Sequence, residues 1–163
     1  MSWTKQTRKA APRTKVWVQV GSVKDAVEIA RACKSDVLVV QGTDAGGHSL
    51  AQGAGIMSLL LEVADAVEAL AKGGTVEEMP LLMAAGGIVE GRGVAAALVL
   101  GAAGVTIGTR FLASAEANIA AGYRDEVVRA SDGGQNTVRP KIYNSLRGAI
   151  GWSRGYNARG CRK

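Results

Sequence analysis

Short apolar runs alternate with helical patterns along this chain, and that alternation limits the possible folds more than any other feature. The runs are rich in aliphatic and β-branched residues, which is typical of strands buried on both faces of a parallel sheet. The predicted strands are 16–20, 36–41, 81–85 and 105–107, and the helical segments that follow them are 23–33, 54–72, 92–100 and 113–131. Four strand–helix units in a row predict an α/β fold with a parallel sheet and right-handed crossovers.

Two architectures fit four (βα) units. They can form a small doubly wound sheet, or they can form half of an eight-stranded barrel. The residue pattern alone does not choose between the two. Both place a ligand at the carboxyl ends of the strands, and the glycine-rich segments of this chain lie at those ends.

The basic residues are concentrated near the two termini. Twelve of the 20 Lys and Arg residues lie in segments 1–15 and 139–163, and neither segment contains an acid. The body between them therefore carries eight basic residues against 14 acidic ones. We predict a basic, disordered segment at 1–15, the four βα units at 16–135, and a basic tail at 136–163 that packs on the sheet or extends from it.

Composition also argues against several partners and compartments. With aromatic residues at only 4%, the chain lacks the stacking platform of single-strand binders, so a nucleic-acid partner is not expected. No apolar run approaches the roughly 20 residues of a membrane-spanning helix. Cys33, which we expect to be buried, and Cys161 have neither metal-ligand spacing nor a disulfide framework. This cysteine usage predicts a reducing, cytoplasmic compartment.

Two glycine-rich turns follow neighbouring strands. Gly86-Gly87 separates the third strand from its helix, and Gly108-Thr109 follows the fourth strand. Glycines at such positions let backbone N–H groups approach a phosphate, and a helix N-terminus adds partial positive charge. Either motif alone is more simply an ordinary tight turn. Two of them in adjacent βα units favour a phosphate site, which recurs at this edge of (βα)8 barrels.

His48 is the only histidine in the chain and ends the segment Gln41–His48, which breaks the second predicted strand. Histidine exchanges protons near neutral pH, so it is the first candidate for a catalytic base. The simpler interpretation is a histidine on a surface loop. Its position after Gly46-Gly47, beyond a buried strand and on the same rim as the predicted phosphate site, favours a catalytic role.

Two polar residues of the same segment have alternative roles. Asp44 either orients the imidazole of His48 or caps helix 54–72. Gln41, at the end of its strand, points into the site or into the interior of a barrel. The pattern of residues leaves both questions open.

Three motifs, taken in order, resemble a known family. They are Gln-Gly-Thr-Asp-Ala-Gly-Gly-His at 41–48, Ala-Ala-Gly-Gly-Ile at 84–88 and Ile-Gly-Thr-Arg-Phe-Leu-Ala at 107–113. Their sequences and spacing resemble those of nitronate monooxygenases, which are FMN-dependent (βα)8-barrel flavoproteins. The resemblance runs from about Val16 to Arg147. It implies that the chain forms the second half of a TIM barrel.

The resemblance also implies roles for individual residues. His48 would be the base that takes the α-proton of a nitroalkane, or that assists a nitronate already deprotonated. The flavin would accept an electron, and chemistry with O2 would give a carbonyl compound and nitrite. The residues implied to hold FMN, the last four of them around its phosphate, are Gln41, Gly42, Gly47, Gly86, Gly87, Gly108 and Thr109.

The chain differs from the family in its length. Family members are about twice as long, and the resemblance covers only their second half. A four-stranded half-barrel has two unpaired strand edges and one uncovered sheet face, so a homodimer that closes the barrel is one expectation. Two other functions fit the same motifs: an FMN-dependent enoyl-acyl-carrier-protein reductase, and a non-catalytic half-barrel that binds FMN or phosphate ligands.

Overall fold

The structure is a computed structural model that describes residues 2–139, 148 and 156–161. Its strands are β1 (Trp17–Val20), β2 (Val37–Gln41), β3 (Gly47–Leu50), β4 (Leu81–Ala85), β5 (Gly104–Thr106), β6 (Thr137–Val138) and β7 (Tyr156–Cys161). Its helices are α1 (Ser2–Ala10), α2 (Val23–Ala32), α3 (Ile56–Lys72), α4 (Gly91–Val99), α5 (Thr109–Leu112), α6 (Ala121–Arg129) and α7 (Gly133–Asn136).

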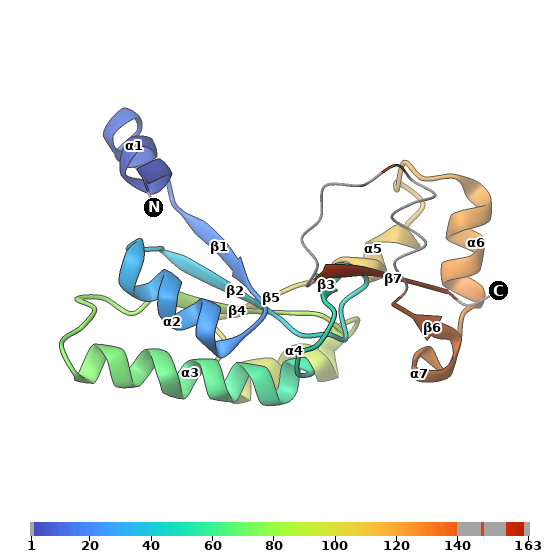
Figure 1. Cartoon of the computed structure of the whole chain (residues 1–163). Helices are drawn as coiled ribbons and strands as arrows, with labels where there is room; N and C mark the ends of the chain where they lie inside the picture. Colours follow the sequence, from blue (N-terminus) through green and yellow to red (C-terminus); the bar gives the residue numbers. More distant parts are fainter. Residues whose placement is uncertain (1, 140–147, 149–155, 162–163) are drawn as a thin grey trace.

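The four predicted strands form one parallel sheet in the order β1-β2-β4-β5. Helices α2, α3 and α4 all lie on the same side of this sheet (Figure 1). An open doubly wound sheet would carry helices on both faces, whereas a barrel carries them only on its outer face. The arrangement is therefore that of half a barrel, and the predicted α/β fold with parallel βα units is confirmed.

The core lies between the sheet and its helices. Alternate strand residues point toward α3, whose apolar stripe meets them, as the side-chain period of a strand requires. The largest fully buried side chains of this core are Leu38, Val40, Leu60, Val63 and Val67. Among the described residues, no helix is long and apolar enough to cross a membrane.

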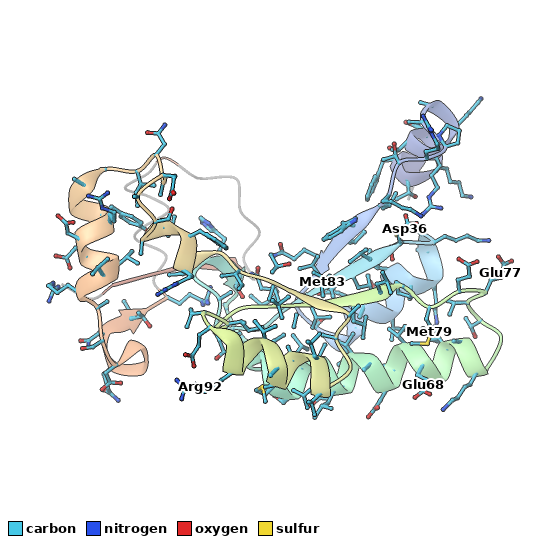
Figure 2. The ribbon with its side chains drawn as sticks, turned by 180° about the vertical axis from the view of Figure 1, so that it is seen from behind. Asp36, Glu68, Glu77, Met79, Met83 and Arg92 are labelled. Carbon is cyan, nitrogen blue, oxygen red and sulfur yellow. The ribbon has the colours of Figure 1, made fainter. Side chains whose placement is uncertain are left out.

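The opposite face of the sheet carries apolar side chains that no described helix covers. Trp17 and Leu81 flank Val37 in one row of the register, and they are 55% and 58% exposed. Met83 lies on the same face, on the side of the sheet away from α3 (Figure 2). In a closed barrel this face would be the packed interior.

A second, antiparallel sheet of order β3-β7-β6 was not predicted. The segment up to His48 was expected to be loop throughout, but Gly47–Leu50 forms β3 and pairs with Tyr156–Cys161. The partner strand lies more than 100 residues further along the chain, so no local sequence pattern predicts the pairing. The basic tail thus returns to the glycine-rich segment, next to α5, α6 and α7 (Figure 1).

The predicted disorder of segment 1–15 is wrong, because residues 2–10 form α1. Asp36, which directly precedes β2, holds this segment in place. Its Oδ2 accepts hydrogen bonds from Arg8 Nη2 at 2.9 Å and from the Val16 N–H at 2.7 Å, while Lys15 Nζ lies 3.2 Å from Oδ1. Two side chains of the basic segment and the Val16 N–H therefore converge on the Asp36 carboxylate, and Asp36 is labelled near α1 in Figure 2. The charge pattern alone did not reveal this partner.

The single helix expected at 113–131 is also wrong, since the structure has α5 at 109–112 and α6 only at 121–129. No residue of α6 is buried. Most helical stability in proteins comes from packing an apolar face. Because α6 has no buried face, no packing favours a longer helix that reaches back to residue 113.

We expect Asp36→Asn to lower the free energy of unfolding by about 1–2 kcal/mol at pH 7, because hydrogen bonds to a charged acceptor are lost or weakened. The Val16 N–H, followed by Lys15 and Arg8, lowers the pKa of Asp36 despite partial burial. This contribution is therefore present above the unfolded-state pKa of about 3.9 and is lost as pH falls through the folded-state value. Urea unfolding at pH 7 and pH 3 measures it.

The matched control is Glu77→Gln, which removes an exposed ion pair with Lys34 and is expected to leave the urea midpoint unchanged. A loss of stability in Asp36→Asn that is equally large at pH 3 and pH 7 would contradict the ionic explanation.

Candidate functional site

Three glycine-rich loops meet at the carboxyl end of the parallel sheet. A β-carbon added at Gly86 would lie 2.9 Å from the backbone nitrogen of Ala45, and one added at Gly87 would lie 2.9 Å from Asp44 Cβ. A β-carbon at Gly46 would lie 2.9 Å from Thr109 Oγ1. The loop after β2 therefore touches both the loop after β4 and the start of α5, as the sequence predicted for a shared rim.

The glycines of the rim divide into two kinds. A β-carbon at Gly42 would lie 2.3 Å from the backbone nitrogen of Ile56, so this glycine permits close packing of the loop on α3. Gly86 and Gly87 have positive φ angles of 102° and 70° in addition to tight contacts. Gly47 and Gly108 face open space, with no described atom within 4 Å of an added β-carbon, and Gly47 also has a positive φ of 70°. Only these last two leave room for a ligand in the β-carbon direction.

Gln41 closes the base of the loop. Its Nε2 donates a hydrogen bond to the carbonyl oxygen of His48 at 3.2 Å. The sequence left open whether this side chain points into the site or into the barrel interior. In the structure it is hydrogen-bonded to the far end of its own loop. The two ends of segment 41–48 are tied together across seven residues.

Asp44 caps α3. Its Oδ2 accepts a hydrogen bond of 2.7 Å from the Ile56 N–H, the first amide of the helix. Gly55 occupies the N-cap position and has no side chain to do this, so the carboxylate comes from the loop instead. Of the two roles predicted for Asp44, the structure shows the cap.

His48 is the second residue of β3 and is half-buried. Its backbone lies opposite Ala158 of β7, and its carbonyl oxygen is the acceptor of the Gln41 bond. The imidazole therefore projects from a paired strand and not from a free loop. A side chain held on a strand is better positioned for proton transfer than one on a mobile turn.

Arg139 is a functional candidate that the sequence analysis missed. Its guanidinium donates to the carbonyl oxygens of Thr43 at 2.8 Å, Ala45 at 2.9 Å and Gly47 at 3.1 Å. In the sequence it was only one basic residue of the tail. No local pattern links it to a loop more than 90 residues earlier, so only the fold reveals the contact.

An apolar hollow of about 330 Å³ lies behind the loops, between α3 and α4. Its walls include Leu60, Ile88, Ala97 and Leu100, and Asp44 is the only charged side chain that lines it in the part of the chain that the structure describes. A negative carboxylate in an apolar setting does not suit a phosphate. This hollow is therefore not where an anionic cofactor group would bind.

The sequence profile of the family described as "Nitronate monooxygenase" matches residues 4–148. The chain belongs to this family. It is 56% identical over 159 residues to nitronate monooxygenase npaC of Metarhizium robertsii, and 44% identical over 147 residues to a nitronate monooxygenase of Neurospora crassa. These matches cover 96% and 90% of the chain but only 42% and 38% of the relatives. The chain thus spans about two fifths of the length of these curated relatives.

Solved structures give the same picture of the fold. FabK from Thermotoga maritima superposes with a TM-score of 0.73 at 31% identity, over 98% of this chain and 43% of FabK. Nitroalkane oxidase from Streptomyces ansochromogenes gives a TM-score of 0.74 over 99% of this chain and 42% of the oxidase, and its 24% identity speaks for the fold alone. Both are TIM-barrel enzymes, so the prediction of a half-barrel is confirmed.

The two kinds of glycine lead to opposite expectations for alanine variants. Gly42→Ala should lower the free energy of unfolding by about 1–3 kcal/mol, because its methyl group would collide with the backbone of Ile56. Gly108→Ala should leave stability within about 0.5 kcal/mol of the wild type, since φ is −111° and the space is open. Denaturant unfolding of both variants measures this. Equal losses in the two would contradict the division.

Proposed function

We propose that this chain carries the base and the phosphate-binding loops of an FMN-dependent enzyme that oxidises alkyl nitronates or nitroalkanes. The products are a carbonyl compound and nitrite, with O2 as the oxidant. One observation carries the proposal: the loop that leads directly into the strand holding His48 meets both glycine-rich phosphate-type loops at a single rim. Membership of the nitronate monooxygenase family supplies the reaction class.

The rim residues suit the phosphate end of FMN. The family is flavin-dependent in general. Gly108 faces open space at the start of α5, where the first amides of a helix have no intrahelical acceptor, so an anion can approach Thr109 and its neighbours. Gly86 and Gly87 shape the adjoining wall, and Gln41, Gly42 and Gly47 complete the set proposed to hold the cofactor. When bound, FMN supplies the electron-accepting and oxygen-activating chemistry.

His48 is proposed to act as the base. A neutral nitroalkane must lose a proton from the carbon that bears the nitro group, whereas a nitronate has already lost it. An imidazole can take that proton and later release it to water near neutral pH. The strand pairing and the Gln41 bond hold the backbone of His48 at the rim where the proposed flavin loops converge.

An enoyl-reductase function is less well supported. The enoyl reductase domain of MlnA from Bacillus amyloliquefaciens superposes with a TM-score of 0.59 at 15% identity, which speaks for the fold alone. The relatives named nitronate monooxygenase are far more similar in sequence. Oxidation of NADH in the presence of an enoyl thioester, without nitrite release from nitronates, would favour the reductase instead.

We expect His48→Ala to lower the turnover of neutral nitroalkanes by about 100-fold or more, because the proton-accepting group is removed. Turnover of preformed nitronates should fall much less, since their proton is already gone. Nitrite release from each substrate measures both rates, and flavin absorbance checks that FMN is retained. Unchanged nitroalkane turnover would contradict the assignment of His48.

We also propose that two copies of the chain associate through the uncovered sheet face and close a barrel. The exposed apolar side chains of that face and the end strands β1 and β5 support this. Parallel pairing of β5 with β1 of the second copy would remove both edges. The rival is a non-catalytic half-barrel that remains a monomer.

We expect the wild type to run as a dimer in size exclusion with light scattering, and Leu81→Lys to run as a monomer because it places a charge on the face. Val99→Lys is the matched control, since Val99 is 87% exposed on α4. A wild-type monomer with no flavin, and no melting shift at excess FMN, would favour the non-catalytic alternative.

A further inference from the structure

Arg139 ties the tail of the chain to the loop that carries His48. It directly follows β6, and its three described hydrogen bonds go to the carbonyl oxygens of Thr43, Ala45 and Gly47. These are alternate residues, so one guanidinium gathers every second carbonyl of the loop on one side. The planar fork of arginine suits several acceptors at once, and its permanent charge shortens and strengthens each bond.

Such a loop needs an external support. It contains Gly42, Gly46 and Gly47, and glycine has more backbone freedom to lose than any other residue. All described peptide bonds are trans, so each carbonyl held by Arg139 directs the N–H of its own peptide the opposite way. The amides of Asp44, Gly46 and His48 are thus turned away from the guanidinium. One side chain sets the orientation of three peptide planes.

The position of His48 depends on two of these ties. The Gly47 carbonyl belongs to the peptide just before His48 and accepts from Arg139. The His48 carbonyl belongs to the peptide just after it and accepts from Gln41. Both peptide planes that flank the α-carbon of His48 are therefore anchored by side chains. The direction of its Cα–Cβ bond follows from that anchoring, so the point from which the imidazole extends is fixed.

We propose that Arg139 is a positioning residue for His48, acting through the backbone of loop 42–47. The importance of that position for catalysis rests on the proposed function, whereas the restraint on the loop does not. Arg139 lies outside the core between the sheet and α3 and is half-buried. Its removal should loosen the loop and the imidazole while the rest of the fold stays intact.

Two readouts of the whole chain test this without substrate or cofactor. The sequence has a single histidine, so the imidazole signal in an NMR spectrum belongs to His48 without further assignment. Hydrogen exchange at the amides of Gly42, Thr43 and Ala45 measures how rigidly the loop is held. These amides donate hydrogen bonds to Ala85 O, Ala54 O and Gly42 O respectively. Core amides of α3 report the stability of the whole fold in the same experiment.

In Arg139→Ala we expect the three loop amides to exchange about 10- to 100-fold faster, with exchange in the α3 core unchanged. The His48 imidazole signal should shift toward that of an unstructured peptide. Arg139→Lys keeps the charge but not the fork, so its loop exchange should fall between wild type and Arg139→Ala. Arg129→Ala is the matched control, because Arg129 has the same charge and a 72% exposed side chain on α6.

Three results would overturn the proposal. Loop exchange and the imidazole signal could remain at wild-type values in Arg139→Ala. The α3 amides could accelerate as much as the loop amides, which would make Arg139 a general stabilising residue. Arg139→Lys could match the wild type, which would mean that charge alone is sufficient. Should Arg139→Ala fail to fold, the loop-to-core exchange ratio in Arg139→Lys decides alone, supporting the proposal if it is raised and overturning it if unchanged.

An activity measurement separates this proposal from the proposed function. Misplacing a base by about 1 Å can cost roughly 100-fold in rate, so Arg139→Ala should lower kcat for neutral nitroalkanes more than for nitronates, with little change in KM. A wild type that releases no nitrite would refute the proposed function, and the exchange and NMR results would still decide the role of Arg139. Equal losses with both substrates would overturn a role through His48.

Discussion

The in-register pairing of β2 with β4 is the constraint on which the site depends. Five residue pairs, from Val37 with Leu81 to Gln41 with Ala85, bring both strands to an end at the same level. The Gly42 N–H then bonds to Ala85 O at 3.0 Å, so the first residues of the two following loops start as neighbours. A shift of one residue would move alternate side chains out of the core and separate the loops.

Beyond the ends of these strands, a few polar contacts hold the loops of the rim together, and glycines allow the loops to approach each other closely. Asp44 binds the first amide of α3, and Gly42 lets the loop lie against the backbone of that helix. Gln41 and Arg139 fix the two peptides that flank His48. Glycines in one rim therefore serve different purposes: some allow the chain to pack on itself, and Gly47 and Gly108 leave open space.

The uncovered face of the sheet has a direct consequence for the site. Strands β1 and β5 end the described sheet, and Trp17 and Leu81 expose apolar surface where a complete barrel has its interior. In the proposed function, the rim would therefore form one wall of the site. Closure by a second half would bury this face and shield the rim from water, which strengthens electrostatic interactions there.

Local patterns were sufficient for the four parallel strands, for helices α2, α3 and α4, and for the meeting of the glycine-rich loops. The runs at 36–41 and 81–85 predicted β2 and β4 almost to the residue, because burial on both faces requires unbroken apolar sequence. The same reasoning placed His48 and the glycine-rich turns together. It failed for α1, whose partner Asp36 is a single carboxylate, and for the helix expected at 113–131, which has no buried face.

The sequence by itself determined the parallel sheet, its core and the edge at which a ligand would bind, because strand and helix periods are local properties of the chain. Only the tertiary structure decided that Asp44 caps α3, that Gln41 binds His48 O, and that β3 pairs with β7. It alone revealed Arg139 as the support of the loop. Each of these contacts joins residues that become neighbours only when the chain folds, so no local pattern in the sequence predicts them.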